Sequence, residues 1–146
     1  MATFVFRIFV SLLTLFVFAL TNLACNSKPK QAFVVVHLDS TIRATKVSIS
    51  ELAENYRAFQ GRYVETTGKF HQAFEEFAIY TDNRLPNGAL EGFWLGTDKD
   101  LSIDNSYLDR MNGKRVTIKG LVDTTHKGHL SSYLATIDKI YFWQEQ

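Results

Sequence analysis

Apolar residues recur at helical spacing just before the middle of the chain, over Ile49–Gln60. The apolar stripe consists of Leu52, Ala53, Tyr56 and Phe59. Ser48 and Glu51 precede it with the spacing of a capping box, in which the serine hydroxyl accepts a hydrogen bond from a free N–H group of the first turn. Gly61 stands just after the last turn, where helices often end. The pattern predicts one amphipathic helix whose apolar side packs against a core.

After this helix the apolar positions change to a period of two, which is typical of strands with one buried face. The first such segment is Gly61–Phe70, with Val64, Thr66, Gly68 and Phe70 on one face. Four further segments predict strands: Glu76–Thr81, Phe93–Leu95, Lys114–Thr124 and Leu134–Trp143. The alternation breaks at Asp138–Lys139, where we expect a bulge in the last strand.

The segments between these strands differ in character. Asp82–Glu91 is rich in turn-forming residues and predicts a loop. The second half of Asp98–Met111 carries apolar residues that predict a short helix. Nearer the N-terminus, Phe33–His37 is a short β-branched run with strand character, and the rest of Gln31–Lys46 has no assigned structure.

Five strands with a helix in front and a short helix between strands three and four suit a five-stranded Greek-key barrel of the OB-fold type. A long strand shared by both sides of such a barrel must bend, and a glycine inside the strand permits this. Gly68 and Gly120 lie inside two of the long predicted strands, and Val116, Ile118, Gly120 and Val122 share one face of the second. The sequence therefore predicts a mainly β domain over residues 48–146.

The runs that carry this pattern also resemble a family. They are Ile49–Tyr56, Gly61–Gly68 and Met111–Gly120. They are similar to small exported bacterial OB-fold proteins of the tRNA-anticodon-domain-like type, which have a helix before a G-[KR]-x-V strand and a second such strand later. The resemblance covers about Ile49–Trp143 and implies the fold. It implies no activity, since the tRNA in the family's name describes ancestry of the fold.

Composition narrows the possible functions. The 146 residues are 46% hydrophobic and 21% charged with two prolines, which excludes a disordered chain. A formal net charge of +1 gives no sign of a polyanion-binding protein. The single cysteine excludes a disulfide framework and every metal site that needs several cysteines.

The N-terminus predicts export. Ile8–Leu20 is an apolar run that follows Arg7, and small residues and then Cys25 come after it. This layout resembles a bacterial lipoprotein signal, in which residues 1–24 are removed and Cys25 carries the lipid. An uncleaved membrane anchor and plain secretion are the alternatives, and all three place the folded part outside the cytoplasm. Residues 25–47 would then form a tether, and the domain would face the periplasm or the exterior from a membrane.

No catalytic signature is present in the sequence. It contains no G-x-S-x-G motif, no phosphate-binding loop and no dinucleotide-binding G-x-G-x-x-G motif. We therefore expect a non-catalytic protein without a cofactor, namely an extracytoplasmic binding module for a small ligand, a glycan or another envelope protein.

Candidate ligand-binding residues come from two features. Tyr80 and Trp94 are expected to point outward on neighbouring strands, where they could stack on a ring or a sugar. The loop residues His71, His126, Lys127 and His129 are expected to border these aromatics and to supply polar contacts. An inward-pointing Trp94 is the competing interpretation, because its predicted strand is too short to define its register.

Two alternative functions remain open. OB-folds often bind nucleic acid, but Glu75, Glu76 and Glu91 lie near the expected binding face and would oppose a phosphate backbone. The three histidines of these loops, His71, His126 and His129, could instead converge on a zinc or copper ion.

Overall fold

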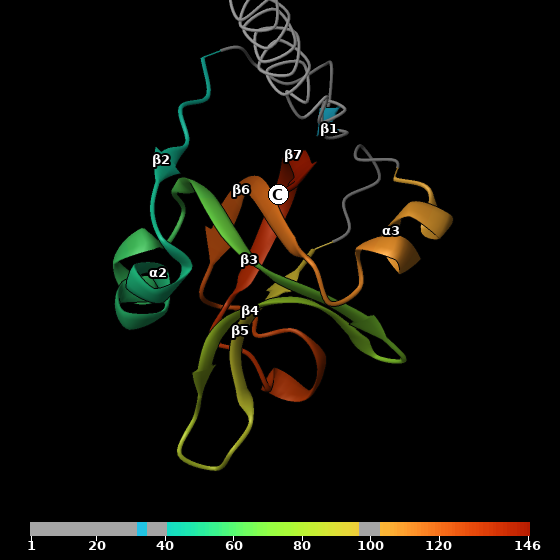
Figure 1. Ribbon diagram of the computed structural model, residues 1–146. Helices are drawn as coiled ribbons and strands as arrows, with labels where there is room; N and C mark the ends of the chain where they lie inside the picture. Colours follow the sequence, from blue (N-terminus) through green and yellow to red (C-terminus); the bar gives the residue numbers. More distant parts are fainter. Residues whose placement is uncertain (1–31, 35–40, 97–102) are drawn as a thin grey trace, which may run out of the picture.

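The computed structural model describes residues 32–34, 41–96 and 103–146, which form a mixed seven-stranded sheet with two α-helices (Figure 1). The elements in chain order are β1 (Ala32–Val34), β2 (Thr45–Lys46), α2 (Ile49–Asn55), β3 (Tyr63–Ala73), β4 (Glu76–Arg84), β5 (Leu90–Leu95), α3 (Asn105–Met111), β6 (Arg115–Asp123) and β7 (Thr136–Glu145). Two short 3-10 helices, η1 (Tyr56–Phe59) and η2 (His129–Ser131), complete the set. The mainly β fold expected from the alternation is confirmed.

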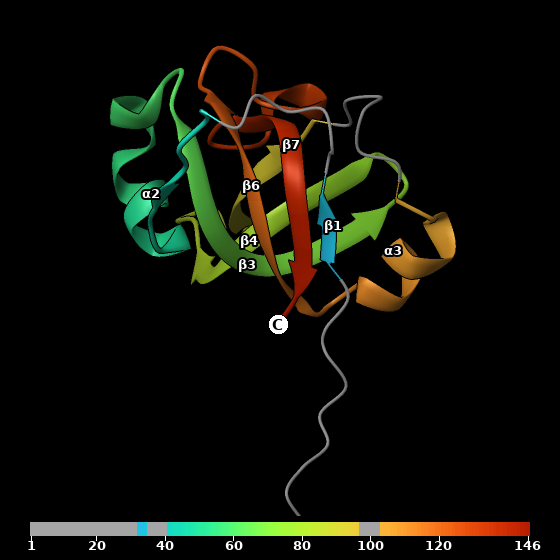
Figure 2. The ribbon, with the colours of Figure 1, turned by 90° about the horizontal axis from the view of Figure 1, so that it is seen from above.

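Five of the strands form a closed ring of hydrogen-bonded pairs, in the order β3, β4, β5, β7, β6 and back to β3. All neighbours in the ring are antiparallel except β5 and β7, which pair in parallel. β1 pairs with the last part of β7, and β2 lies parallel to the start of β3 (Figure 2). Two segments of the N-terminal region therefore belong to the same sheet as the rest.

The faces assigned to the two predicted strands with an internal glycine are confirmed. On β3, Val64 and Phe70 have no exposed surface and Thr66 is 2% exposed. On β6, the alternate positions Val116 and Ile118 are fully buried. Period-two patterning identifies these faces because each strand has one side in the core and one side outside it.

The helix before β3 is shorter than the pattern predicts. The α-helix ends at Asn55, and η1 follows it as a tighter last turn. The capping interaction is confirmed, since the Glu51 N–H donates to Ser48 Oγ at 3.2 Å. Helix ends often tighten into 3-10 turns that satisfy otherwise free carbonyl groups, which the apolar stripe cannot reveal.

The expected loop Asp82–Glu91 is instead largely a hairpin. β4 continues to Arg84 and β5 begins at Leu90, so only a short turn separates them. This turn is closed by the N–H of Leu85, which donates to the carbonyl of Ala89 at 2.8 Å. The turn-forming residues occupy this short connection, and the flanking polar residues extend the strands.

The short helix between the third and fourth ring strands is confirmed as α3. Asp104 caps it, because its carboxylate accepts from the Ser106 N–H at 2.6 Å. The apolar residues Tyr107, Leu108 and Met111 turn into the core. In Figure 2, α2 lies to the left of the strands and α3 lies to the right.

The bulge expected in β7 is also confirmed. Leu121 of β6 pairs with Asp138, while Lys119 pairs with Phe142, so three residues of β7 face the single residue Gly120. A side chain at Gly120 would place its Cβ 2.8 Å from the Asp138 carbonyl oxygen. Gly120 is therefore required by the close approach of β7.

The inner face of the sheet is packed with aromatic residues. The rings of Phe70 and Trp143 lie 4.9 Å apart, edge to face, and Phe77 lies 5.3 Å from Phe70. Trp143 is fully buried in this cluster. In the parts of the chain that the structure covers, no helix combines the length and apolar character needed to cross a bilayer.

Candidate functional site

The two candidate aromatics lie on the outer face of the sheet. Tyr80 pairs with Gly92, and Ala78 pairs with Trp94, which places both rings opposite the buried Ile79. The outward direction of Trp94 is confirmed, since it is half-buried, whereas its neighbours in β5 are fully buried. The expectation that Tyr80 is exposed is wrong, because only 7% of it is accessible.

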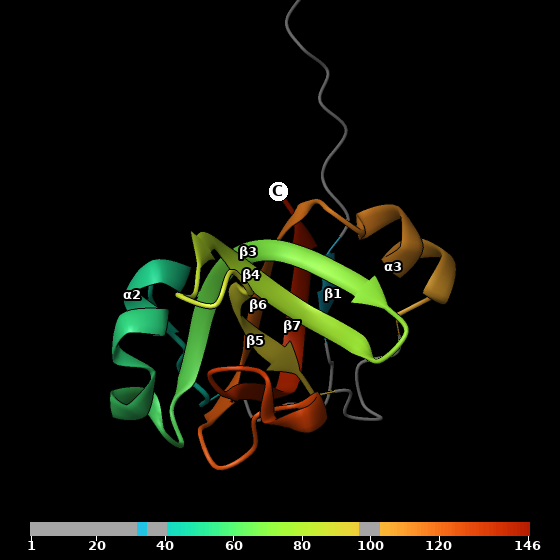
Figure 3. The ribbon, with the colours of Figure 1, turned by 90° about the horizontal axis from the view of Figure 1, so that it is seen from below.

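The segment between β6 and β7 folds back across β5 (Figure 3), and its residues contact these aromatics. The Tyr133 ring lies 5.3 Å from the Trp94 ring and 6.2 Å from the Tyr80 ring. Gly128, with φ of +62°, passes so close to Trp94 that an added Cβ would lie 2.6 Å from the Trp94 Cβ. Sequence patterning does not reveal this cover, because it depends on how a loop folds back across the sheet.

Tyr80 is held by polar contacts beneath this cover. Its hydroxyl donates to Glu76 Oε1 at 2.6 Å, and the Tyr133 hydroxyl lies 3.3 Å away. Burial, and next the hydrogen bond to Glu76, raise the pKa of Tyr80 well above its ordinary value. The hydroxyl therefore stays protonated and acts as a donor. The edge of the His71 ring contacts the face of the same cluster, 5.4 Å from the Tyr80 ring centre.

The three histidines do not converge. His71 packs against Tyr80, His126 Nδ1 lies 2.6 Å from Asp123 Oδ2, and His129 Nε2 lies 3.1 Å from Glu75 Oε2. Among the residues that the structure describes, no three His, Cys, Asp or Glu side chains are grouped to hold a metal ion. The hypothesis of a three-histidine metal site is therefore not supported by this geometry.

Lys127 lies half-buried in the same loop, between the two histidines. Its carbonyl accepts a hydrogen bond from the Tyr133 N–H at 3.2 Å, which helps to hold Tyr133 over the aromatics. The role of Lys127 in the structure thus comes from its main chain.

An aspartate, a threonine and a histidine form a small polar cluster at the end of β6. Asp123 accepts from the Thr125 hydroxyl and pairs with His126, and these contacts lower the pKa of Asp123. The hydrogen bond to Asp123 raises the pKa of His126. Both neighbours contact the Nδ1 side of the imidazole, whereas a catalytic triad needs its nucleophile at the other ring nitrogen. The cluster is therefore built to stabilise a turn.

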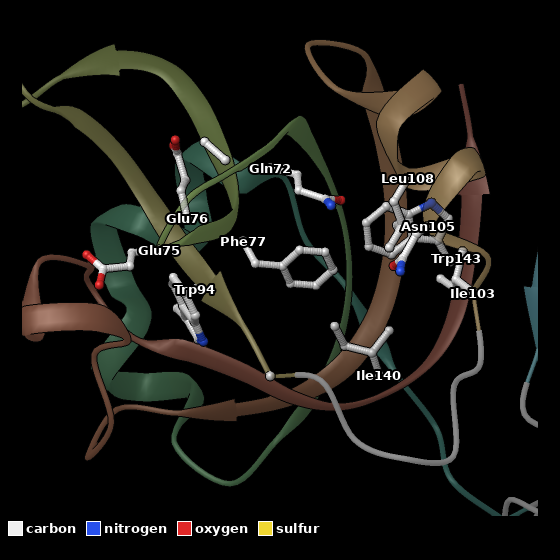
Figure 4. Close-up of a pocket in the computed structure, with 12 residues that line it drawn as sticks. Gln72, Glu75, Glu76, Phe77, Trp94, Ile103, Asn105, Leu108, Ile140 and Trp143 are labelled. Atoms are coloured by element: carbon white, nitrogen blue, oxygen red, sulfur yellow. The ribbon is translucent and has the colours of Figure 1, made fainter.

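A pocket of about 430 Å³ opens next to Trp94 (Figure 4). The pairing of β4 with β5 ends at Ala78 opposite Trp94, so Glu76 and Phe77 lie beyond it. The pocket is lined by Gln72, Ala73, Glu75, Glu76, Phe77, Trp94, Gly96, Ile103, Asn105, Leu108, Ile140 and Trp143. Of the sequence candidates, only Trp94 contributes to it.

The polar groups of the pocket are carboxylates and amides. Glu75 and Glu76 lie near Trp94, while Gln72 and Asn105 contribute amides further along (Figure 4). The side-chain oxygen of Gln72 is buried without a hydrogen-bond partner within the described residues. No lysine or arginine belongs to the described lining. Glu75 and Glu76 are thus the charged residues of the described lining.

Two turns joined by an ion pair contain unusual backbone. Glu75, Leu130 and Ser131 have φ of 58°, 51° and 56°, in the left-handed region that side chains rarely adopt. The Glu75–His129 ion pair joins the two turns that carry these residues. Phe74 is 91% exposed in the first turn and Leu130 is 83% exposed in the second. Strained residues of this kind often mark functional sites.

The export signal of residues 1–24 and Cys25 lie outside the described residues, so their expected roles rest on the sequence alone. Comparison with models of known protein families and with curated proteins gives no match.

Proposed function

We propose that this chain is a non-catalytic binding protein whose domain holds a small organic ligand in the pocket beside Trp94. The observation that carries the proposal is the pocket itself, with a volume of about 430 Å³. Aromatic and aliphatic side chains with a few polar groups are the usual lining of small-molecule sites. We assign an OB-fold to the domain that contains this pocket.

The strand order supports the assignment of an OB-fold. Five strands close a ring, with the third ring strand, β5, parallel to the last, β7, and with α3 between the third and fourth. OB-folds are five-stranded Greek-key barrels that bind ligands across their middle strands and adjoining loops. Trp94 and Glu76 belong to the corresponding strands.

The N-terminal sequence supports a place in the cell envelope. The apolar run Ile8–Leu20 followed by Cys25 suits a lipoprotein signal, so we propose a membrane-anchored protein that faces the periplasm or the exterior. A glycan or an envelope protein is a further possible ligand of such a module. We favour a small ligand for two reasons. The pocket is concave, and the Tyr80 ring on the outer face is covered by Tyr133 of the β6–β7 segment, so it is not free to bind a larger partner.

Nucleic acid is a weaker candidate. A stacking site for single strands needs a basic groove beside its aromatics. Glu75 and Glu76 stand there instead. A carboxylate on the rim repels a phosphate backbone, so the acidic side of the pocket argues against this alternative.

Tryptophan fluorescence tests the proposal. Trp143 is fully buried and Trp94 is half-buried, so quenching by acrylamide should come mainly from Trp94. The chain is screened against small amines, oligosaccharides and oligonucleotides, with Trp94→Phe as the control that removes the response. Saturable protection of Trp94 by a small molecule supports the pocket. Binding of oligonucleotides alone, or of no compound, would contradict the proposal.

A further inference from the structure

We infer that Asn87 is a site of spontaneous modification, at which the side-chain amide is lost and the chain converts to aspartate and isoaspartate through a cyclic imide. Asn87 and Gly88 lie in the turn of the β4–β5 hairpin, and the chain carries a second dipeptide of the same kind, Asn112–Gly113. Neither asparagine lines the pocket beside Trp94, so the site goes beyond the proposed function.

The reaction needs only the chain itself, hydroxide and water. Hydroxide takes the proton of the Gly88 main-chain nitrogen, which then attacks Cγ of Asn87. A bond forms between this nitrogen and Cγ, the bond from Cγ to Nδ2 breaks, and Nδ2 leaves as ammonia. Water opens the cyclic imide at either carbonyl, which gives aspartate or isoaspartate with no change in oxidation state. A glycine after the asparagine favours the attack, because it has no Cβ to obstruct the approach.

The turn that carries Asn87 is exposed and is closed by local contacts. The hairpin projects below both helices in Figure 1. Asn87 and Gly88 are both exposed, and a Cβ on Gly88 would meet nothing within 4 Å outside its chain neighbours. The Gly88 N–H donates to the Leu85 carbonyl at 2.8 Å, and the Leu85 N–H donates to the Ala89 carbonyl at 2.8 Å. Opening of this tip therefore frees the attacking nitrogen without unfolding the domain.

The side chain of Asn87 is already folded back on the turn. Its Oδ1 accepts a hydrogen bond from the Ala89 N–H at 3.1 Å. Within the described residues its Nδ2, which is the leaving group, makes no hydrogen bond. The carboxamide is thus held beside the peptide that attacks it, and no contact of Nδ2 has to be broken.

Asn112 is also exposed, but both of its reacting groups are bound to a core strand. Its Nδ2 donates to the Gln72 carbonyl at 2.8 Å, and its Oδ1 accepts from the Gln72 N–H at 3.1 Å. The Gly113 N–H donates to the carbonyl of Phe70, a fully buried residue of β3, at 2.8 Å. Attack at Asn112 therefore requires the connection between α3 and β6 to separate from β3.

The two products differ in their effect on the hairpin. Aspartate keeps an oxygen that can accept from the Ala89 N–H, and it adds a negative charge near Arg84, whose Nη1 donates to the Gly88 carbonyl at 2.7 Å. Isoaspartate runs the main chain through the side-chain carbons and so lengthens it by a methylene group. The longer turn disturbs the pairing of Leu85 with Ala89. The modification thus changes both the charge and the shape of the hairpin tip.

Peptide mapping by mass spectrometry tests the assignment. The folded full chain is incubated at mildly alkaline pH and then digested in mild acid, where the reaction is slow. We expect aspartate and isoaspartate to accumulate at position 87 at least about tenfold faster than at position 112, because Asn112 must first lose its hydrogen bonds to Gln72. Similar rates at the two positions would overturn the assignment, and so would aspartate without isoaspartate at position 87.

The same chain unfolded in guanidinium chloride is the matched control. Unfolding removes the hydrogen bonds of Asn112, so the two Asn–Gly dipeptides should then react at similar rates. A preference for Asn87 that persists after unfolding would mean that the fold does not protect Asn112. An Asn87 that reacts in the unfolded chain and not in the folded one would overturn the assignment.

Two variants identify the reacting groups. Gly88→Ala should slow the reaction at Asn87 about tenfold and leave Asn112 unchanged, because the added Cβ obstructs the attacking nitrogen. Since φ of Gly88 is +84°, which disfavours a side chain, Asn87→Gln is a second variant. It should abolish the acidic forms that arise at this position, as measured by isoelectric focusing. Acidic forms that appear in Asn87→Gln at the wild-type rate would place the reaction elsewhere and overturn the assignment.

Discussion

The hydroxyl of Tyr80 makes a part-buried hydrogen bond to a carboxylate. It donates to Glu76 Oε1 at 2.6 Å, under the cover of Tyr133. Hydrogen bonds to charged groups contribute about 1.5–3 kcal/mol. Removing the hydroxyl leaves a carboxylate oxygen beside an apolar ring edge, which adds to the loss.

Tyr80→Phe should therefore lower the free energy of unfolding by about 2 kcal/mol. Denaturation by urea measures this change. Tyr63→Phe is the matched control, because Tyr63 is half-buried on the same sheet and packs its ring on Tyr141. A loss in Tyr80→Phe no greater than in Tyr63→Phe would show that the hydrogen bond to Glu76 contributes little.

A second effect at the scale of single residues concerns pH. The pKa of His126 is raised by Asp123, and the pKa of Asp123 is lowered by Thr125 and His126. The aspartate stabilises the fold above its unfolded pKa of about 3.9, and this contribution is lost as pH falls through the lowered pKa. The histidine stabilises the fold below its unfolded pKa of about 6.5, and this contribution is lost as pH rises through the raised pKa.

Asp123→Asn should move the titration midpoint of His126 down toward its ordinary value. NMR titration of the histidine ring protons measures the midpoint, and His129, which pairs with Glu75 instead, is the internal control. A midpoint of His126 that does not move would mean that Asp123 is not its partner in solution.

At the scale of elements, the long strands depend on close backbone approach. A Cβ at Gly120 would lie 2.7 Å from Ile137 Cγ2, and a Cβ at Gly68 would meet Ile49 Cδ1 of α2. Neither glycine has a positive φ, so the requirement is for space. The bend expected at these glycines is thus accompanied by contacts that leave no room for a side chain.

Gly120→Val should destabilise the domain by about 3 kcal/mol, because the added side chain forces β7 away from β6. Thermal or urea unfolding measures the loss. Lys69→Val is the control, since it places the same β-branched residue at an exposed position of β3. Equal stability of the two variants would argue against the close pairing at the bulge.

The buried faces of the strands could be predicted from the sequence, whereas the pocket could not. Val64, Phe70 and Val116 were assigned to the buried side because a strand alternates its faces, and this needs no knowledge of neighbouring strands. The pocket could not be predicted, because it forms where β4 extends past β5 and brings Phe77 near Ile140. Such contacts join residues far apart in the chain, and no local pattern records them.

Tyr80 was misjudged for a related reason. Its strand position is outward, as alternation requires, but its exposure depends on the Gly128–Tyr133 segment that covers it. The end of α2 and the extent of the β4–β5 hairpin were misjudged because turn-forming residues mark a connection without defining its length. Trp94 points outward, which is one of the two orientations that its short predicted strand leaves open.

At the scale of the whole molecule, the proposed lipid anchor at Cys25 can be tested directly. Mass spectrometry of the membrane-extracted protein should find a mature chain that begins with an acylated Cys25, because this cysteine directly follows the apolar run and small residues. Cys25→Ser should release the domain from the membrane or leave the signal uncleaved. Recovery of the wild-type protein with residues 1–24 intact would favour the uncleaved anchor.

The pairing of β1 with β7 limits how far such an anchored domain can move. Ala32 pairs with Gln144, and it follows Cys25 by only seven residues. Because a chain spans at most about 3.5 Å per residue, Cys25 and Ala32 can be separated by no more than about 25 Å. A lipid at Cys25 would thus tether the domain through a short segment, and it would keep the C-terminal end of β7 close to the bilayer surface. The pocket would then encounter molecules in the membrane at a high effective concentration, so even a ligand with weak affinity would occupy it.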